Sequence, residues 1–372
     1  MIPGVRRVQV VRRMVQLFVV AFMLTMPAVA RYNNYLSAHQ LDRMLEKWQG
    51  TPQGDALGLI DSAMRMLPGG QGERGGRTQR NRSRLMHYAQ QFRGSPWSAE
   101  VGGLSMTDPL AGAESIAASR RVPWVLIAGL VVPLIATILL GRVFCSWICP
   151  MGFLLELTDK LRGVLRFLEI HPRNLRLSRR VKYALLGTGL LLAALLSTPV
   201  LGYVYPPAIL SRELHDVVFA AFDRAEIGRF GLGFGGLSWM MLVPAAIVLM
   251  ELTVSRRWWC RYVCPGGALY SLLGWARPVR VKLAASRCNA CALCTAACPM
   301  GLNPMKNRMG MECDNCGVCI SACDQSALDY GFAAPLIAAR SAGAPGKAPV
   351  VRRPRATAAR PAVRPRKVRN VR

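Results

Sequence analysis

Four long apolar stretches alternate along the chain with polar, mainly basic segments. A helix needs roughly 20 apolar residues to cross a hydrocarbon layer of about 30 Å. The four stretches run approximately over 14–30, 122–141, 183–203 and 237–254. The pattern therefore predicts an α-helical integral membrane protein with about four transmembrane helices.

The first apolar stretch has two interpretations. Four arginines precede it and it ends in Ala28-Val29-Ala30, which is also the pattern of a cleavable signal peptide. We interpret 1–30 as an N-terminal transmembrane anchor, with a signal-like segment as the alternative. In either case 31–121 begins outside the cytoplasm and is predicted to be a periplasmic loop, flexible around 69–84, with short helices near 41–48 and 57–66.

The distribution of basic residues predicts the orientation. The segment 142–182 has nine Lys and Arg against three acids, whereas 204–236 has three against four. Because Lys and Arg accumulate on the cytoplasmic side of short loops, the first segment is predicted to be cytoplasmic and the second periplasmic. The chain is thus expected to be a multi-pass protein of the bacterial inner membrane, with all its cysteines at the inner surface or in the cytoplasm.

The composition adds a basic C-terminal tail to this picture. The chain is 52% hydrophobic and yet has a net charge of +28, and the stretch from Arg340 onward has eleven Lys and Arg and no acid. Such a sequence cannot bury a core, so 336–372 is predicted to be a disordered, Arg/Pro-rich cytoplasmic tail near membrane lipid. No folded nucleic-acid motif accompanies it, and no specific nucleic-acid partner is expected.

Eight of the twelve cysteines form two ladders with one spacing, C-x2-C-x2-C-x3-C. This is the spacing of bacterial ferredoxins, in which three thiolates bind one 4Fe-4S cluster and the fourth binds the neighbouring one. The crossed assignment puts one cluster on Cys288, Cys291, Cys294 and Cys323. The other cluster is assigned to Cys313, Cys316, Cys319 and Cys298.

The segment 279–335 is therefore predicted to be a small α+β ferredoxin domain of the bacterial two-cluster type. A pair of structural zinc sites is the alternative, for which two CxxC pairs separated by a longer loop would be expected. Asp324 stands where a proline usually follows the fourth cysteine of the second ladder, which leaves the ligands intact.

The other four cysteines belong to an internal repeat within 122–278, the predicted membrane core. The stretches RVFCSWICPMGFLLEL and RWWCRYVCPGGALYSL align without a gap, and each follows an apolar stretch. Such a duplication places a site between its two halves. The candidate residues of this site are Cys145, Cys149, Cys260 and Cys264.

Three interpretations of these CxxxCP motifs stay open. On a helix, thiols at i and i+4 share a face, and two facing pairs could hold an additional iron site or act as a disulfide relay. They could also be helix-end cysteines that pack as small apolar residues. The amphipathic stretch 153–168 that follows the first motif is expected to lie in the inner interface, where it could form a wall of a quinone pocket.

Two further features limit the chemistry. The four histidines lie outside the apolar stretches and no CxxCH occurs, so the sequence offers neither paired haem b ligands nor covalent haem attachment. Glu251 is the one ionisable residue well inside an apolar stretch, and such a carboxylate is a functional candidate. It could also simply pair with Arg256 or Arg257.

The repeated CxxxCP motifs followed by the double ladder resemble the NapH/MauN-type membrane ferredoxins, a polyferredoxin family related to NosR and CcoG. The resemblance covers roughly 122–324 and implies a quinol-linked, membrane-embedded electron carrier with cytoplasmic clusters. The segments 31–121 and 336–372 depart from a minimal NapH.

The expected function is electron transfer between the quinone pool and a redox partner, such as a cytochrome or a reductase subunit, through two 4Fe-4S clusters. The chain would then be a component of a quinol dehydrogenase. One alternative is an accessory factor that supplies electrons for metalloenzyme assembly or metal reduction. Another is a passive membrane anchor for a dehydrogenase complex.

Overall fold

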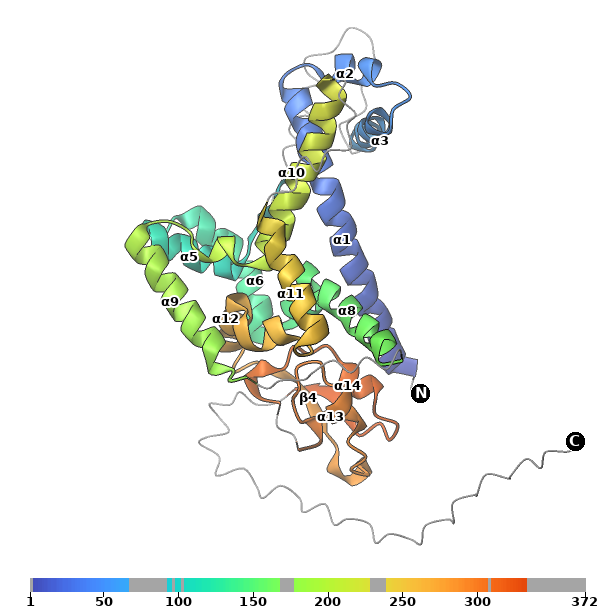
Figure 1. The fold of residues 1–372 in the computed structure, drawn as a ribbon, viewed down its shortest axis with the longest axis vertical. Helices are drawn as coiled ribbons and strands as arrows, with labels where there is room; N and C mark the ends of the chain where they lie inside the picture. Colours follow the sequence, from blue (N-terminus) through green and yellow to red (C-terminus); the bar gives the residue numbers. More distant parts are fainter. Residues whose placement is uncertain are drawn as a thin grey trace, which may run out of the picture.

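The computed structural model describes residues 3–66, 92–95, 98–101, 104–167, 177–227, 239–306 and 309–332. The flexible part expected at 69–84 and the tail expected at 336–372 lie outside these residues. The described chain is mainly helical with two small antiparallel sheets, and its ends are a helical head and a ferredoxin domain, joined by a helical core (Figure 1).

The head forms around the far end of α1 (Pro3–Ser37). The chain turns back there through α2 (Leu41–Lys47) and α3 (Pro52–Met66), close to where the sequence predicts short helices. The second half of α10 (Pro206–Ile227) packs against them. Aromatic and aliphatic side chains of these helices, among them Tyr32, Trp48, Leu57 and Phe222, form one buried cluster.

A three-stranded sheet and a short helix connect the head to the core. The strands β1 (Phe92–Ser95), β2 (Ser98–Val101) and β3 (Leu104–Thr107) form an antiparallel meander. Helix α5 (Pro109–Ser119) follows and packs on the core helices. Its Glu114 is buried and accepts hydrogen bonds from the amides of Leu201 and Gly202.

The helical core contains both halves of the internal repeat. The first half consists of α6 (Trp124–Leu140), α7 (Val143–Trp147) and α8 (Pro150–Phe167). The second consists of α11 (Leu242–Thr253), a wide π-helical turn at Trp259–Val263 and α12 (Pro265–Leu273). Helix α9 (Arg180–Leu196) stands between them in the sequence and packs against α5 and α12.

Helices occupy all four apolar stretches, but they differ in length. Among the described residues, one helical segment, Val8–Ser37 of α1, is both long and apolar enough to cross a membrane by itself. Helices α6 and α9 have 17 residues each and α11 has 12. At 1.5 Å per residue, 17 residues span about 26 Å, somewhat less than a hydrocarbon layer.

The ferredoxin domain lies at the opposite end of the molecule from the head (Figure 1). Strands β4 (Val279–Leu283) and β5 (Leu328–Phe332) pair antiparallel, so the beginning and the end of the domain lie side by side. Two short helices, α13 (Leu293–Ala297) and α14 (Val318–Ser321), each carry the third cysteine of a ladder. Buried residues from both ladders meet between the helices and the strand pair.

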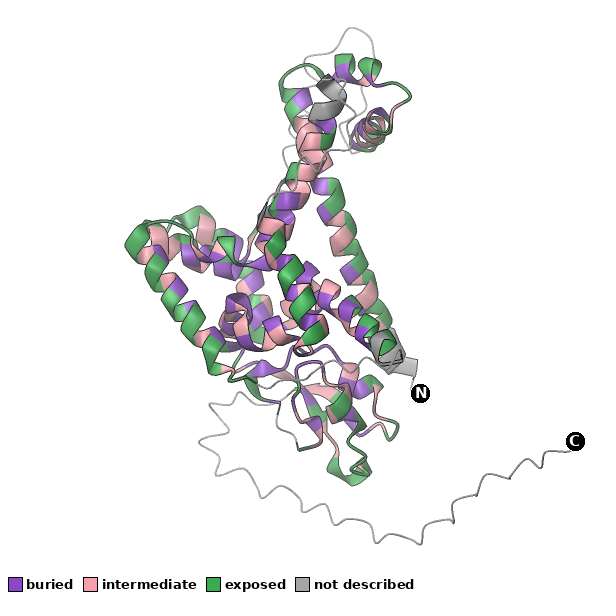
Figure 2. Ribbon diagram, viewed as in Figure 1, coloured by how far each residue is buried: buried purple, intermediate pink, exposed green. Residues whose placement is uncertain are grey.

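The two sides of the helical core differ in solvent exposure. Figure 2 shows exposed residues along α9 and α11, and these include large apolar side chains such as Leu191, Leu195, Leu242 and Leu249. The inner sides of the same helices contribute Leu186 and Ile247 to buried clusters. An apolar outer surface of this kind marks a region that contacts lipid or another apolar partner.

Candidate functional site

The four cysteines of the CxxxCP motifs line one pocket between the two halves of the repeat. Cys145 and Cys149 come from the first half, and Cys260 and Cys264 from the second. The rest of the wall is mainly aromatic and apolar, and it includes Phe144, Met151, Tyr205, Trp259 and Tyr270. The duplication thus brings four thiols from two distant parts of the sequence to one place.

The two motifs close with the same kind of turn, which differs from the single helix expected from the i, i+4 spacing. The amide of Cys149 bonds to the carbonyl of Phe144 at 2.8 Å, and that of Cys264 to Trp259 at 2.9 Å, so each motif closes a wide i−5 turn. A new helix then begins, because the proline that follows can start a helix but cannot continue one.

The second thiol of each motif consequently lies at a helix N-terminus. The Sγ atoms of Cys149 and Cys264 each accept a hydrogen bond of 3.3 Å, from the amides of Gly152 and Gly267 respectively. The positive end of the helix dipole and a free backbone amide both favour negative charge on sulfur. The first and second thiols of each motif therefore sit on different elements and still face one pocket.

The arginine that begins each motif is buried beside this pocket. Arg142 is fully buried and Arg257 is 4% exposed. The Arg142 guanidinium donates to the carbonyl of Cys260 at 3.3 Å, so it reaches from the first motif to the second. Each arginine is close enough to its own motif's first thiol, Cys145 or Cys260, for their charges to interact.

Burial keeps these thiols neutral. It is the main cause that raises the pKa of Cys145 and Cys149 above the ordinary value, and it raises the pKa of Cys260 to about 12 and that of Cys264 to about 11. A thiol in such a site is a poor nucleophile, because thiol–disulfide exchange needs the thiolate. Bound metal, in contrast, displaces the thiol proton.

The ladder cysteines also gather across the two repeats. Cys298 of the first ladder lines a pocket together with Cys313, Cys316 and Cys319 of the second. In the other direction, Cys294 lies near Cys291 and Cys323: burial raises its pKa, and the charges of those two thiols add to the effect. The structure thus groups Cys298 with three cysteines of the second ladder, and Cys323 with Cys291 and Cys294 of the first.

The donor sets suit four-iron clusters. Within the described part of the chain, no three His, Cys, Asp or Glu side chains are grouped as ligands of a single metal ion. A four-iron cluster instead takes one thiolate on each iron, so its ligands spread around a larger body. Backbone amides of Leu302 and Ala327 donate to the sulfurs of Cys298 and Cys323 at 3.4 and 3.3 Å, which stabilises negative charge on them.

The backbone of the two ladders repeats as well. Ala290 and Asn315, 25 positions apart, have φ of 58° and 50°, and the next matching pair, Ala292 and Gly317, has 61° and 71°. Left-handed residues turn the chain sharply, so successive cysteines point toward a common centre. Both ladders therefore wrap their ligands in the same way, although only one of these four positions is glycine.

The second ladder is attached to the helical core by a network centred on Glu312. Its carboxylate accepts hydrogen bonds of 2.6 Å from Arg142 and from Tyr183, and it also pairs with Lys182. Burial raises the pKa of Glu312, but the charges of Arg142 and Lys182 outweigh this and the net pKa is lowered. Glu312 thus remains an anion between two buried cations.

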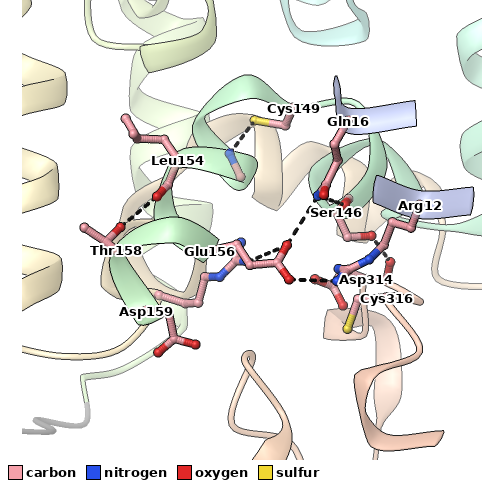
Figure 3. Close-up of polar contacts among 12 residues, drawn as sticks. Arg12, Gln16, Ser146, Cys149, Leu154, Glu156, Thr158, Asp159, Asp314 and Cys316 are labelled. Atoms are coloured by element: carbon pink, nitrogen blue, oxygen red, sulfur yellow. Dashed lines mark hydrogen bonds and ion pairs between the residues drawn. The ribbon is translucent and has the colours of Figure 1, made fainter. Parts of the chain in front are cut away.

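Backbone groups of the second ladder continue this attachment. Ser146 donates to the carbonyl of Asp314 at 2.7 Å, Gln9 to that of Cys316 at 2.9 Å, and Asn315 to the carbonyl of Leu140 at 2.8 Å. Figure 3 shows this region, where α1 and the first motif meet the ladder. The sequence did not indicate these residues, although the acidic residues Glu312 and Asp314, which the first ladder lacks at the matching positions, were an available signal.

In the same view α1 is linked to α8 through Glu156 (Figure 3). Glu156 accepts from Arg12 at 2.7 Å, from Arg13 at 2.6 Å and from Gln16 at 3.3 Å. Gln16 also donates to the carbonyl of Ser146 in the first motif. The N-terminal half of α1 therefore borders both the thiol pocket's first motif and the second ladder.

A buried carboxyl group lies next to two tyrosines that line the thiol pocket. Asp108, just before α5, accepts a hydrogen bond of 3.2 Å from the hydroxyl of Tyr205, and Tyr270 lies beside the same group. Burial raises the pKa of Asp108 to about 6, although the Leu110 amide and Tyr205 lower it. Tyr205 belongs to a segment expected in an outer loop, yet it packs against the core because α10 begins beside α12.

The Glu251 carboxylate is hydrogen-bonded to the backbone. Glu251 is buried near the end of α11, and its carboxylate accepts the backbone amides of Arg257 and Trp258. Arg256, the other partner considered, binds Asp159 of α8 at 2.7 Å instead. Glu251 therefore holds the turn that leads into the second CxxxCP motif.

Comparisons with known proteins identify relatives of the chain. Residues 122–167 and 236–283, the two halves of the repeat, match the sequence family Fer4_5, described as a 4Fe-4S binding domain. The chain is 28% identical over 240 residues to the ferredoxin-type protein NapH of Haemophilus influenzae, covering 61% of this chain and 75% of that protein. No solved structure matches the chain.

Two further relatives extend the family. The methylamine utilization ferredoxin-type protein MauN of Paracoccus denitrificans is 34% identical over 213 residues, covering 56% of this chain and 66% of its own length. An uncharacterized protein of Methanocaldococcus jannaschii is 32% identical over 216 residues, or 56% and 79%. About a third of MauN thus lies beyond the matched part. The chain belongs to the ferredoxin-type, iron–sulfur electron-transfer family that includes NapH and MauN.

Proposed function

We propose that this protein is embedded in the bacterial inner membrane and carries electrons, one at a time, between the quinone pool and a redox partner. The observation that carries the proposal is the attachment of a ferredoxin ladder to a thiol pocket in the helical core. Arg142 bonds to the second CxxxCP motif with one nitrogen and to Glu312, which precedes Cys313, with the other. A single side chain therefore bridges the two candidate redox sites.

In this proposal the ladders hold two 4Fe-4S clusters in the crossed arrangement. Cys288, Cys291, Cys294 and Cys323 hold one, and Cys313, Cys316, Cys319 and Cys298 hold the other. Each cluster, when bound, accepts or gives up one electron at a time. The pocket that Cys298 shares with three cysteines of the second ladder supports the crossing.

The four-thiol pocket is proposed to hold a further cluster rather than a disulfide relay. Its four thiols come from both halves of the repeat, and backbone amides donate to two of the sulfurs, as they do in the ladders. Charge balance supports the cluster: four thiolates on an oxidised four-iron core leave about two negative charges, and Arg142 and Arg257 are two buried cations beside them. Glu312 and Glu156 are shared with Lys182 and Arg12, and Asp314 and Glu251 are further acidic groups whose charges act on these arginines.

The outer surface of the core supports insertion in the membrane. Trp124 of α6 and several leucines of α9 and α11, such as Leu191 and Leu249, have exposed side chains. We propose that α1, α6, α9 and α11 cross the bilayer and that the ferredoxin domain and the tail lie in the cytoplasm, on the side that carries the basic loop 142–182.

Reduction by a quinol tests the proposal. The full chain is purified anaerobically in detergent, and a soluble quinol analogue is added while the iron–sulfur absorption is recorded. We expect bleaching in the wild-type chain and in an Asp329→Asn control, since Asp329 is exposed on β5. Absence of a response to quinol, with full reduction by dithionite, contradicts the quinone link and favours an accessory factor that supplies electrons for metalloenzyme assembly or metal reduction.

A further inference from the structure

The two ladders repeat each other in sequence and backbone but not in exposure. Glu312, Cys313, Asp314, Asn315, Cys316 and Gly317 of the second ladder are all buried. The six matching residues of the first ladder are Arg287, Cys288, Asn289, Ala290, Cys291 and Ala292. All of these are exposed except Cys288, which is half-buried.

This difference follows from what covers each ladder. The loop of the second ladder is held against α1, α6, α7 and α9 by side chains such as Gln9, Ser146 and Arg142. The matching loop of the first ladder bonds within itself, from the Cys291 amide to the Asn289 side chain at 3.3 Å. One ladder therefore faces the helical core and the other faces away from it.

Cys298 also belongs to the side that faces the helical core, with Cys313, Cys316 and Cys319. It follows α13 in the first ladder but lines the pocket of the second. The chain on both sides of it is bound to the core: Arg256 donates to the carbonyl of Ala296 at 3.4 Å, and Arg179 to that of Met300 at 2.8 Å. Cys298, Cys313 and Cys316 of the inner set thus lie in segments that are hydrogen-bonded to the core.

We infer that the two ladders work in series, with the Cys298/Cys313/Cys316/Cys319 set next to the thiol pocket. The exposed loop 287–293 is then the face at which a soluble one-electron redox protein binds. The inference rests on the proposed function and adds the order of the two ligand sets and the surface at which electrons leave the protein. In the quinol-oxidising direction, one quinol loses two electrons and two protons to become quinone. Clusters bound by the two sets would relay the two electrons singly, the inner set before the outer set, to two molecules of a one-electron partner, and the two protons would be released to solvent.

The composition of the loop fits a small, mainly uncharged contact with such a partner. Between Arg287 and Thr295 no side chain is charged, and Ala290, Ala292 and Cys291 are short, so a partner can approach the outer ligands closely. Leu293 adds an apolar side chain that is 47% exposed. Transient redox encounters use small interfaces, and interface centres are depleted in charge.

A pair of ligand variants tests the order of the two sets in the full chain in detergent. In Cys316→Ser the inner cluster is lost, and we expect a quinol analogue to leave the outer cluster oxidised while dithionite still reduces it from solution. In Cys291→Ser the outer cluster is lost, and quinol should still reduce the inner one at the wild-type rate. Quinol reduction of the outer cluster at the wild-type rate in Cys316→Ser overturns the inference. Failure of quinol to reduce any cluster in the wild-type chain overturns the proposed function instead.

Surface variants test the exit face with cytochrome c as the soluble one-electron acceptor. Leu293→Glu and Leu293→Lys should both slow quinol-driven reduction of cytochrome c, by about tenfold, because either charge disrupts an uncharged contact. Quinol reduction of the clusters themselves should not change. Phe332→Glu and Phe332→Lys are the matched controls, since Phe332 is 80% exposed and lies at the other end of the strand pair. If the Phe332 variants slow cytochrome c reduction equally, or if the Leu293 variants do not slow it, loop 287–293 is not the exit face.

Discussion

Arg142 donates a hydrogen bond of 2.6 Å to Glu312, and the two residues are 170 positions apart in the sequence. Arg142 begins the first CxxxCP motif and Glu312 immediately precedes the second ladder. Both are buried, and Lys182 and Tyr183 complete the set of donors around the carboxylate. The pair therefore fixes the ferredoxin domain to the helical core at the point where the two candidate redox sites adjoin.

Removing the charge of Glu312 should weaken this attachment. Glu312→Gln leaves Arg142 and Lys182 buried without their anion, and breaking a buried ion pair from one side costs about 3–5 kcal/mol. We expect a lower unfolding temperature in detergent and slower reduction of the ladder clusters by quinol, with reduction by dithionite unchanged. Asp329→Asn, on the exposed side of β5, is the control. An unchanged unfolding temperature in Glu312→Gln would show that the pair does not hold the domains together.

The thiol pocket should be separable from the ladders. Cys149→Ala and its repeat partner Cys264→Ala each remove the sulfur at a helix N-terminus and leave all eight ladder cysteines in place. Both variants should lose about four iron per chain and the response to quinol, while the ladder clusters keep their EPR signals. Normal quinol oxidation by either variant would contradict a role of the thiol pocket in that reaction.

Asp108 should accept a proton when quinol is oxidised at the thiol pocket. Its carboxyl group is one hydrogen bond from Tyr205, which lines that pocket, and burial raises its pKa to about 6. The carboxylate exists above this pH, so the rate of cluster reduction by quinol should rise with pH through about 6. Asp108→Asn should be slower and should lose this dependence. If Asp108→Asn kept the wild-type pH profile, another group would be responsible for the pH dependence of cluster reduction.

Matching backbone positions of the ladders should respond differently to substitution. Gly317 has φ of +71°, and a Cβ there would lie 2.6 Å from the Tyr330 hydroxyl and 3.1 Å from the Gln9 side chain. Gly317→Ala should therefore destabilise the chain, by about 1–2 kcal/mol for the backbone alone. Ala292→Gly, at the same place in the exposed ladder, should be nearly neutral or stabilising. Thermal unfolding of the two variants compares them directly, and equal effects would contradict the asymmetry.

Sequence reasoning reached the parts of the site that depend on local spacing. The ladder spacing and the gapless CxxxCP repeat indicated which cysteines belong together, and the structure brings Cys145, Cys149, Cys260 and Cys264 to one pocket. The i, i+4 spacing was a poorer guide to local structure. Pro150 and Pro265 start new helices, so the two thiols of each motif do not share one helix face.

The long-range attachments were beyond local patterns. Glu312 is 170 positions from Arg142 and 130 from Lys182, so these partners meet only in the folded chain. Similarly, hydropathy put Tyr205 in an outer loop, whereas its contact with Asp108 depends on the packing of α5, α10 and α12. Periodicity reports which face of an element is buried, but not which distant polar side chains become partners.

Iron and acid-labile sulfide, measured together with EPR on the anaerobically purified full chain, test the central claim that these cysteines hold four-iron clusters. The account predicts about twelve iron and twelve sulfide per chain, falling by about four in Cys291→Ser and by about four in Cys149→Ala. A folded chain that contains no iron, or contains zinc in its place, would contradict the account. A value near eight that does not fall in Cys149→Ala would contradict the cluster in the thiol pocket.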